Sequence, residues 1–172
     1  MLHDWASPIG QFLAGVVAAI LCMAAVHDVL ARTVPNWMPI VIAALGTIES
    51  ALGGRLIASL LVGAFVFILS GLCWKRGWLG GGDVKLLGAA AVAMPPMAVP
   101  PFVAAVALAG GVLGLAYLAL GRLIPAAVLR RPVARPIGLL PRAWRLERRR
   151  LSRGGPLPYA VAIAAGGLFV LL

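Results

Sequence analysis

Six long apolar segments, separated by short joints, constrain the fold of this chain more than any other feature. They cover about 9–30, 37–52, 56–74, 83–99, 101–120 and 158–172. Most of them approach the ~20 residues with which an α-helix crosses ~30 Å of hydrocarbon. The chain is 62% hydrophobic and only 12% charged, whereas soluble domains are about 45–50% apolar and about 25% charged. We therefore expect a multi-pass membrane protein.

The segments are continuously apolar and lack the alternation of apolar and polar residues that a membrane-spanning strand requires. We predict an all-α bundle of about six transmembrane helices, forming one domain over residues 1–172. Small residues such as Gly88-Ala89-Ala90-Ala91 would let these helices pack closely. The prolines of Met94-Pro95-Pro96 and Val99-Pro100-Pro101 are expected to form the turn between the fourth and fifth helices.

The basic residues predict how the bundle is oriented. Ten of the fifteen Lys and Arg residues lie between Arg122 and Arg153, and cytoplasmic loops carry an excess of such residues. We expect the N-terminus outside and the connection of about 122–155 inside, in the cytoplasmic (inner) membrane. Because membrane segments flank this basic connection, we expect it to contact anionic lipid headgroups and not nucleic acid, despite a net charge of +10.

Acidic residues are rare, and two of them stand at the ends of apolar segments. The five are Asp4, Asp28, Glu49, Asp83 and Glu147. Asp83 follows three glycines at the start of the fourth segment, and Asp28 lies near the end of the first. With the orientation above, both belong to the inner face and to a similar depth, so their carboxylates can meet. Glu49 lies toward the outer end, where we expect it to pair with Arg55.

Two carboxylates at one depth form an acid–base pair. Like-charge repulsion opposes ionisation of the second group, so near neutral pH the two can hold one proton between them. One member can then take a proton from an attacking water, while the other protonates the oxyanion or the leaving nitrogen. Such a pair hydrolyses amides without a covalent intermediate, and we expect neither a metal nor a cofactor. The two cysteines, Cys22 and Cys73, are expected to be buried thiols.

Three stretches of the chain together resemble the type IV prepilin peptidases, which are membrane aspartic proteases with a Gly-x-Gly-Asp motif. They are Arg32-Thr33-Val34-Pro35-Asn36, Gly80-Gly81-Gly82-Asp83-Val84-Lys85-Leu86-Leu87-Gly88 and Pro156-Leu157-Pro158-Tyr159-Ala160-Val161-Ala162-Ile163-Ala164. The likeness runs through all six segments in order. It implies that Asp28 and Asp83 are the catalytic residues.

The resemblance also implies a substrate and supporting residues. The substrate would be a prepilin or pseudopilin, cut at the inner boundary between a short basic leader and an apolar helix. Gly80 and Gly82 belong to the motif, and Pro35, Asn36 and Lys85 are candidate supporting residues. Longer members carry paired Cys-x-x-Cys motifs and a methyltransferase activity between the first two spans. Here that joint has only about six residues, so we expect cleavage without N-methylation, as in the short peptidases of Flp-type pili in tight-adherence systems.

Structural explanations stand beside these functional ones. Asp28 could be a helix-end residue paired with Arg32, and Asp83 could be favoured by the helix dipole. A lysine at position 85 could extend its ammonium group to the headgroups, and Asn36 could belong to an ordinary turn. His27 is expected to point away from Asp28. For the whole chain, the alternatives are a non-catalytic scaffold of a pilus or secretion system and a small proton-coupled transporter.

Overall fold

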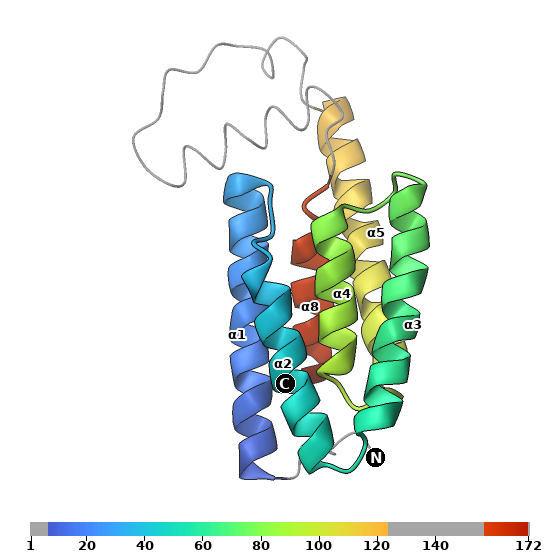
Figure 1. Ribbon diagram of the computed structural model, residues 1–172. Coiled ribbons are helices and arrows are strands. Elements are labelled where there is room, and N and C mark those ends of the chain that lie inside the picture. The colour runs from blue at the N-terminus through green and yellow to red at the C-terminus, as the bar shows by residue number, and fades with distance from the viewer. Residues whose placement is uncertain (1–6, 124–156, 172) are drawn as a thin grey trace.

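The computed structural model describes residues 7–123 and 157–171, and all regular secondary structure within them is helical (Figure 1). The helices are α1 (Pro8–Ala31), α2 (Trp37–Leu52), α3 (Leu56–Lys75), α4 (Gly81–Val92), α5 (Val99–Leu123) and α8 (Tyr159–Leu171), with a short 3-10 helix, η1 (Pro96–Ala98). The start of α1 illustrates how the local sequence determines where a helix begins. Ser7 accepts a hydrogen bond from the Gly10 N–H at 3.0 Å, and Pro8 occupies the first turn, where its missing N–H costs nothing.

Five of the six predicted segments coincide with helices to within about three residues, and the fourth was predicted too long. The helix α4 ends at Val92 and not near residue 99, because a residue that precedes proline is pushed out of the helical conformation. The turn predicted between the fourth and fifth helices does lie here, over residues 93–98. Pro100 and Pro101, however, belong to the first turn of α5, which tolerates proline.

Three helical stretches are long and apolar enough to cross a membrane. They are Pro8–Ala31, Leu56–Lys75 and Pro96–Leu123. The helices α2 and α8 are apolar but shorter, with 16 and 13 residues. At 12 residues, α4 reaches only about 18 Å at 1.5 Å per residue. The chain is thus a helical membrane protein with three clear candidate spans and three shorter helices.

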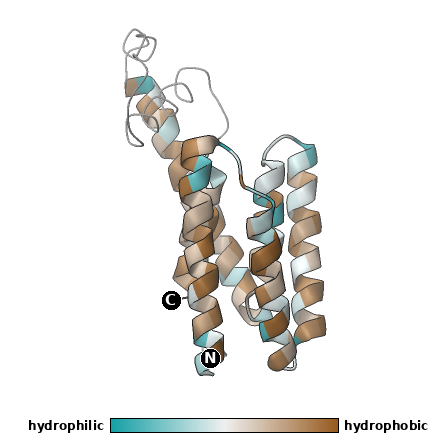
Figure 2. Cartoon of the chain, turned by 60° about the vertical axis from the view of Figure 1, so that its left-hand side comes forward, coloured by the Kyte–Doolittle hydropathy of each residue, from teal (hydrophilic) through white to brown (hydrophobic). Residues whose placement is uncertain are grey.

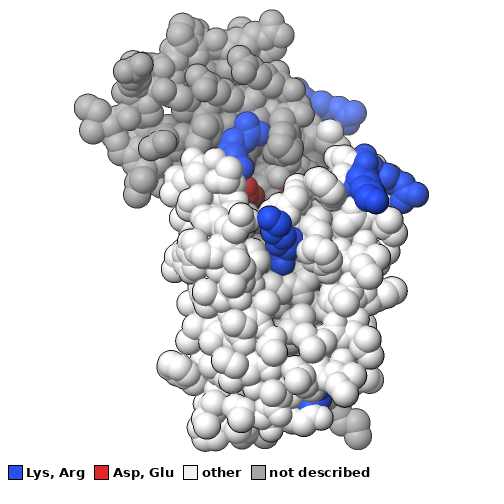
Figure 3. All heavy atoms as spheres, viewed as in Figure 1, with Lys and Arg blue, Asp and Glu red and all other residues white. Residues whose placement is uncertain are grey.

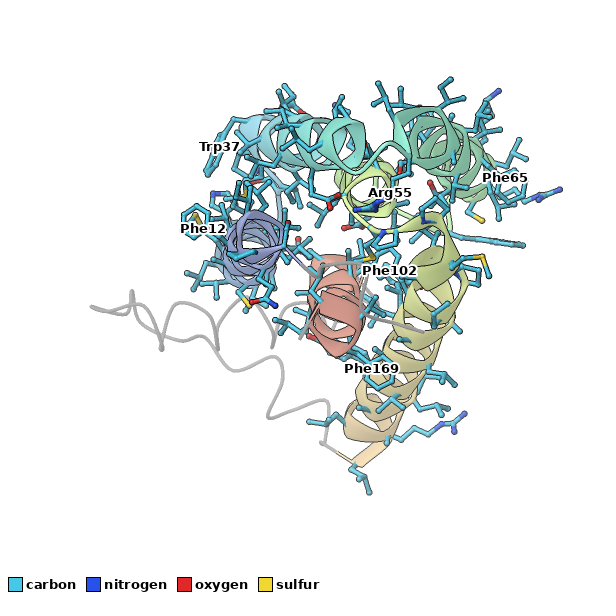
Figure 4. All side chains as sticks on the ribbon, turned by 90° about the horizontal axis from the view of Figure 1, so that it is seen from below. Phe12, Trp37, Arg55, Phe65, Phe102 and Phe169 are labelled. Atoms are coloured by element: carbon cyan, nitrogen blue, oxygen red, sulfur yellow. The ribbon has the colours of Figure 1, made fainter. Side chains whose placement is uncertain are left out.

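The helices α4 and α8 form the centre of the bundle (Figures 1 and 4). The first packs against α2 and α3, the second against α1 and α5, and the two contact each other. Small residues make this packing close. A Cβ atom on Gly63 would lie 2.2 Å from Val92, and one on Gly88 would lie 2.9 Å from Phe67. The α3–α4 contact therefore depends on glycine at both positions.

The outer surface of the bundle is apolar, as lipid contact requires. Phe12, Phe65 and Phe169 point outward from three different helices, whereas Phe102 is fully buried between them (Figure 4). Hydrophobic residues cover most of the helical surface, and hydrophilic ones lie mainly near the helix ends (Figure 2). A soluble protein would not expose so much continuous apolar surface.

Basic side chains gather toward the end of the bundle where α1, α3 and α5 finish and α4 begins (Figure 3). The described residues of this group are Arg32, Lys75, Arg76, Lys85 and Arg122. This uneven distribution is the one expected if that end faces the cytoplasm. Most of the arginine-rich connection of about 122–155, and with it the predicted lipid contact, lies outside the described residues.

Candidate active site

Asp28 and Asp83 line one cavity of about 280 Å³ at the basic end of the bundle. It lies between the α1–α2 connection and the start of α4. Its lining consists of Asp28, Arg32, Thr33, Val34, Asn36, Gly80, Gly81, Gly82, Asp83 and Lys85. Residues about 50 positions apart thus share one small space, and the lining includes both carboxylates, both motif glycines and two candidate supporting residues.

Asp28 occupies the last turn of α1, where the chain reverses toward the cavity. Arg32 adopts a left-handed conformation, with φ of 58°, and its N–H donates to the Asp28 carbonyl at 2.8 Å. For a residue other than glycine this conformation costs about 1–2 kcal/mol. The His27 ring donates from Nδ1 to the Thr33 carbonyl at 2.6 Å. His27 therefore holds the returning connection and is absent from the cavity lining, as its helix position predicts.

Asp83 is the third residue of α4 and serves the helix as well as the cavity. Its Oδ2 accepts a hydrogen bond from the Gly80 N–H at 3.3 Å, which satisfies one of the donors left over at the helix start. A carboxylate is also favoured at this end by the helix dipole. The structural explanation for Asp83 is thus correct, and it is compatible with a place in the site because the same side chain lines the cavity.

A side chain at either flanking glycine of the motif would be crowded, whereas one at the middle glycine would not. A Cβ atom on Gly80 would lie 2.8 Å from Asp83 Oδ2, and one on Gly82 would lie 3.2 Å from the Val34 Cβ. At Gly81 the nearest neighbour, Trp74, would be 3.6 Å away, at ordinary contact distance. A side chain at the first glycine would push the carboxylate, and one at the third would push the α1–α2 connection. This geometry accounts for the spacing Gly-x-Gly-Asp.

Asn36 and Lys85 join the two parts of the chain that carry the aspartates. Lys85 Nζ donates to Asn36 Oδ1 at 2.9 Å. Asn36 stands at the N-terminus of α2, but its side chain makes no capping bond there. Pro35 is absent from the cavity lining, and its carbonyl accepts from the Met38 N–H at 3.1 Å in the turn that starts α2. Asn36 and Lys85, unlike Pro35, both line the cavity.

The cavity lining contains two acidic and two basic side chains, which differ in burial. Asp28 and Asp83 are buried, and the charge of Asp28 acts on Asp83. Arg32 and Lys85 are exposed. A like charge nearby disfavours the charged form of a carboxylate.

The remaining acidic and sulfhydryl groups lie elsewhere. Glu49 and Arg55 form an ion pair at the opposite end, which confirms that prediction. Asp4 and Glu147 lie outside the described residues. The prediction of buried thiols was wrong, because Cys22 is exposed and Cys73 is half-buried on the apolar outer surface. In a membrane protein an apolar side chain gains as much by facing lipid as by facing the core.

Sequence patterns did not single out Arg32, Thr33 and Val34 as site-lining residues. They line the cavity because the left-handed residue Arg32 turns the connection back over the start of α4. Two signals were available in the sequence: this stretch is one of the three that carry the family resemblance, and it lies four to six residues after Asp28. Proximity in sequence does not, however, show toward which neighbouring helix a connection folds.

Residues 15–115 match the model of the type IV leader peptidase family. This region is more than half of the chain, and it includes both aspartates, Asn36, Lys85 and the glycine motif. The match ends within α5, so α8 lies outside it. No curated protein and no solved structure has significant similarity to the chain. On the strength of the family match, the chain belongs to the type IV leader peptidase family.

Proposed function

We propose that this protein is an aspartic endopeptidase that removes the basic leader from type IV prepilins or pseudopilins, of the Flp type, at the cytoplasmic face of the membrane. The family supplies the general activity, which is processing of prepilin-type precursors. The observation that supports the aspartic mechanism is the single cavity lined by Asp28 and Asp83. The two aspartates are 55 residues apart within the matched region, and both line this cavity.

The chemistry follows from a pair of carboxyl groups holding one proton. The ionised member takes a proton from water as the water oxygen attacks the scissile carbonyl carbon. The protonated member donates its proton to the carbonyl oxygen, giving a neutral tetrahedral intermediate. Collapse of this intermediate breaks the C–N bond, the departing nitrogen receives a proton, and the pair returns to one shared proton. The chain supplies the acid, the base and the position of the substrate.

The geometry also suits cleavage without methylation. Only five residues, 32–36, connect α1 to α2. They are occupied in lining the cavity and in the turn before α2, which leaves no room for an additional domain at this joint. The proposal includes six membrane-embedded helices in one domain over residues 1–172, with the N-terminus outside. The basic connection of about 122–155 would rest on anionic headgroups of the cytoplasmic membrane.

The decisive experiment compares cleavage of an Flp-type precursor by the wild-type protein and by Asp28→Asn and Asp83→Asn. Each substitution should lower the rate by about 10²–10⁴-fold, the range for loss of a general acid or base. Glu49→Gln is the matched control, because it removes a buried carboxylate from the other end of the bundle. It should retain the wild-type rate per folded molecule.

Two outcomes would contradict the proposal. Wild-type cleavage rates in either aspartate variant would exclude the dyad mechanism. Absence of cleavage by every form, including the wild type with several prepilin-type precursors, would favour a non-catalytic scaffold. A proton-coupled transporter would instead show proton uptake in sealed vesicles, lost on either Asp→Asn substitution, without any precursor cleavage.

A further inference from the structure

A larger and mostly apolar groove adjoins the dyad cavity. It measures about 600 Å³ and lies between α2, α3 and α4. Ala43 of α2, Leu60 and Ala64 of α3 and Val92 of α4 are among its lining residues. In Figure 1 the helix α4 is seen between α2 and α3, which both pack on it. The groove is therefore a trough with α4 as its floor.

The groove and the dyad cavity share two lining residues, Asn36 and Lys85. These are the residues joined by the 2.9 Å hydrogen bond. Among the described residues they are also the only polar side chains in the groove lining. The apolar trough and the cavity lined by the two carboxylates therefore adjoin at one amide and one ammonium group.

The dimensions of the groove fit the flank of a helix. From Lys85 to Val92 along α4 the distance is about 10 Å, or two helical turns, at 1.5 Å per residue. A helix about 10 Å wide occupies roughly 400 Å³ per turn. A groove of about 600 Å³ would hold about half the cross-section of two to three turns. Ala43 and Ala64 line it, and small residues allow a second helix to approach closely.

We infer that this groove is the docking site for the apolar helix of the precursor, an inference that rests on the proposed peptidase function. The helix would lie against α4 between α2 and α3, with its end nearest the leader at Asn36 and Lys85. A peptide cut in the cavity must continue past these two residues, and an apolar helical segment matches the groove that begins there. The groove runs from the basic end of the bundle inward, which is the direction the helix must take into the membrane.

The Asn36–Lys85 pair has a defined part in this arrangement. At the end of a helix the last backbone groups lack intrahelical partners, and here the substrate would leave its helix to enter the cavity. Lys85 uses one of its three donors on Asn36. The remaining donors of the ammonium group and of the Asn36 amide can bind carbonyl groups of the substrate at this crossing. The pair would hold the extended segment beside the carboxylates.

Cross-linking tests the inference without requiring cleavage. The background carries Cys22→Ser and Cys73→Ser, because both thiols are accessible, and Asp83→Asn to trap the precursor. A single cysteine is then placed by Ala64→Cys in the groove, or by Ala58→Cys, an exposed position of α3 outside the groove lining. The probe is a precursor with a basic leader, an apolar helix and one cysteine in that helix. Cross-linking should be several-fold higher at position 64 than at position 58.

A kinetic comparison accompanies the cross-linking. Ala64→Trp fills the groove and should lower kcat/KM for the full precursor by about tenfold or more through lost binding. It should lower kcat/KM much less for a short peptide that ends before the apolar helix. Ala58→Trp is the matched control and should cleave both like the wild type.

The outcomes separate this inference from the proposed function. Equal cross-linking at positions 64 and 58, or none at 64, would overturn the groove assignment even if the wild type cleaves the precursor; a lipid-filled groove would give that result. Preferential cross-linking at 64 would support docking even if the wild type failed to cleave, a failure that would count against the peptidase mechanism alone. An equal loss on both substrates in Ala64→Trp would also count against the groove.

Discussion

The two ends of the bundle bury carboxylates in opposite ways. At one end Glu49, 8% exposed, forms an ion pair with Arg55. At the other end Asp28 and Asp83, each 9% exposed, line the same cavity. Burial is alike, but the first arrangement satisfies a charge and the second sets two like charges against each other. An opposite charge nearby favours the charged form of a carboxylate, whereas a like charge nearby disfavours it. The first arrangement suits a structural role, and the second is the one on which the proposed mechanism depends.

The largest expected effect comes from removing either member of the dyad. Asp28→Asn and Asp83→Asn should each lower kcat by about 10²–10⁴-fold, and the double variant should be no slower than the slower single variant. Groups that act as one unit show such non-additive losses. Rates from single-turnover cleavage in detergent would measure this. If the rate loss of the double variant equals the product of the two single losses, the two carboxylates act independently. The contrast between a cooperating pair at this end and an ion pair at the other end would then be wrong.

Next in size is displacement of the dyad by a side chain in the glycine motif. Gly80→Ala places a Cβ 2.8 Å from Asp83 Oδ2. A shift of the carboxylate by about 1 Å can cost on the order of 10²-fold in rate. Gly81→Ala is the control, because its Cβ meets nothing closer than 3.6 Å. Both variants should melt at similar temperatures, so equal activity in the two would refute the steric account of the motif.

At the outer end a substitution should change stability and leave the rate alone. Glu49→Gln weakens a charged hydrogen bond to Arg55, worth about 2 kcal/mol. The melting temperature in detergent should fall, while kcat/KM of the folded fraction stays within error of the wild type. A large loss of activity without a change in melting would show that the outer end also serves the reaction.

The smallest effect should come from the Asn36–Lys85 bond. In a double-mutant cycle of Asn36→Ala and Lys85→Met, the coupling energy in kcat/KM should be about 1 kcal/mol, typical of directly contacting side chains. The cycle should be run with the full precursor, since the pair stands where the cavity meets the groove. Additive losses would mean that the bond is incidental to the site and that the two residues act separately.

Much of the fold was predictable because bilayer thickness imposes long apolar segments. The helices α1, α2, α3, α5 and α8 follow from continuous apolar runs, and the expected meeting of Asp28 and Asp83 followed from the charge distribution of the joints. The early end of α4 was not predicted, because residues 93–99 are as apolar as those of the helix before them. Apolarity reports contact with lipid or core, and it does not report whether a backbone is helical.

The surroundings of the dyad were harder to predict for a different reason. Whether residues 32–34 fold over the cavity depends on a single left-handed residue, Arg32, and nothing in its side chain favours that conformation. The exposure of Cys22 could not be inferred either, since lipid-facing and core-facing positions of α1 are equally hydrophobic. Periodicity separates inside from outside only when the outside is water.

The shape of the glycine motif has an evolutionary consequence. Gly80 and Gly82 each leave space that another group already fills, while Gly81 has room for a side chain. Across homologues the middle position should therefore drift freely among small and polar residues, and the flanking positions should hardly vary. What matters at the two flanking positions is the absence of a Cβ atom, a property that only glycine has. A lineage that loses either glycine would therefore regain the original geometry most simply by mutating back to glycine.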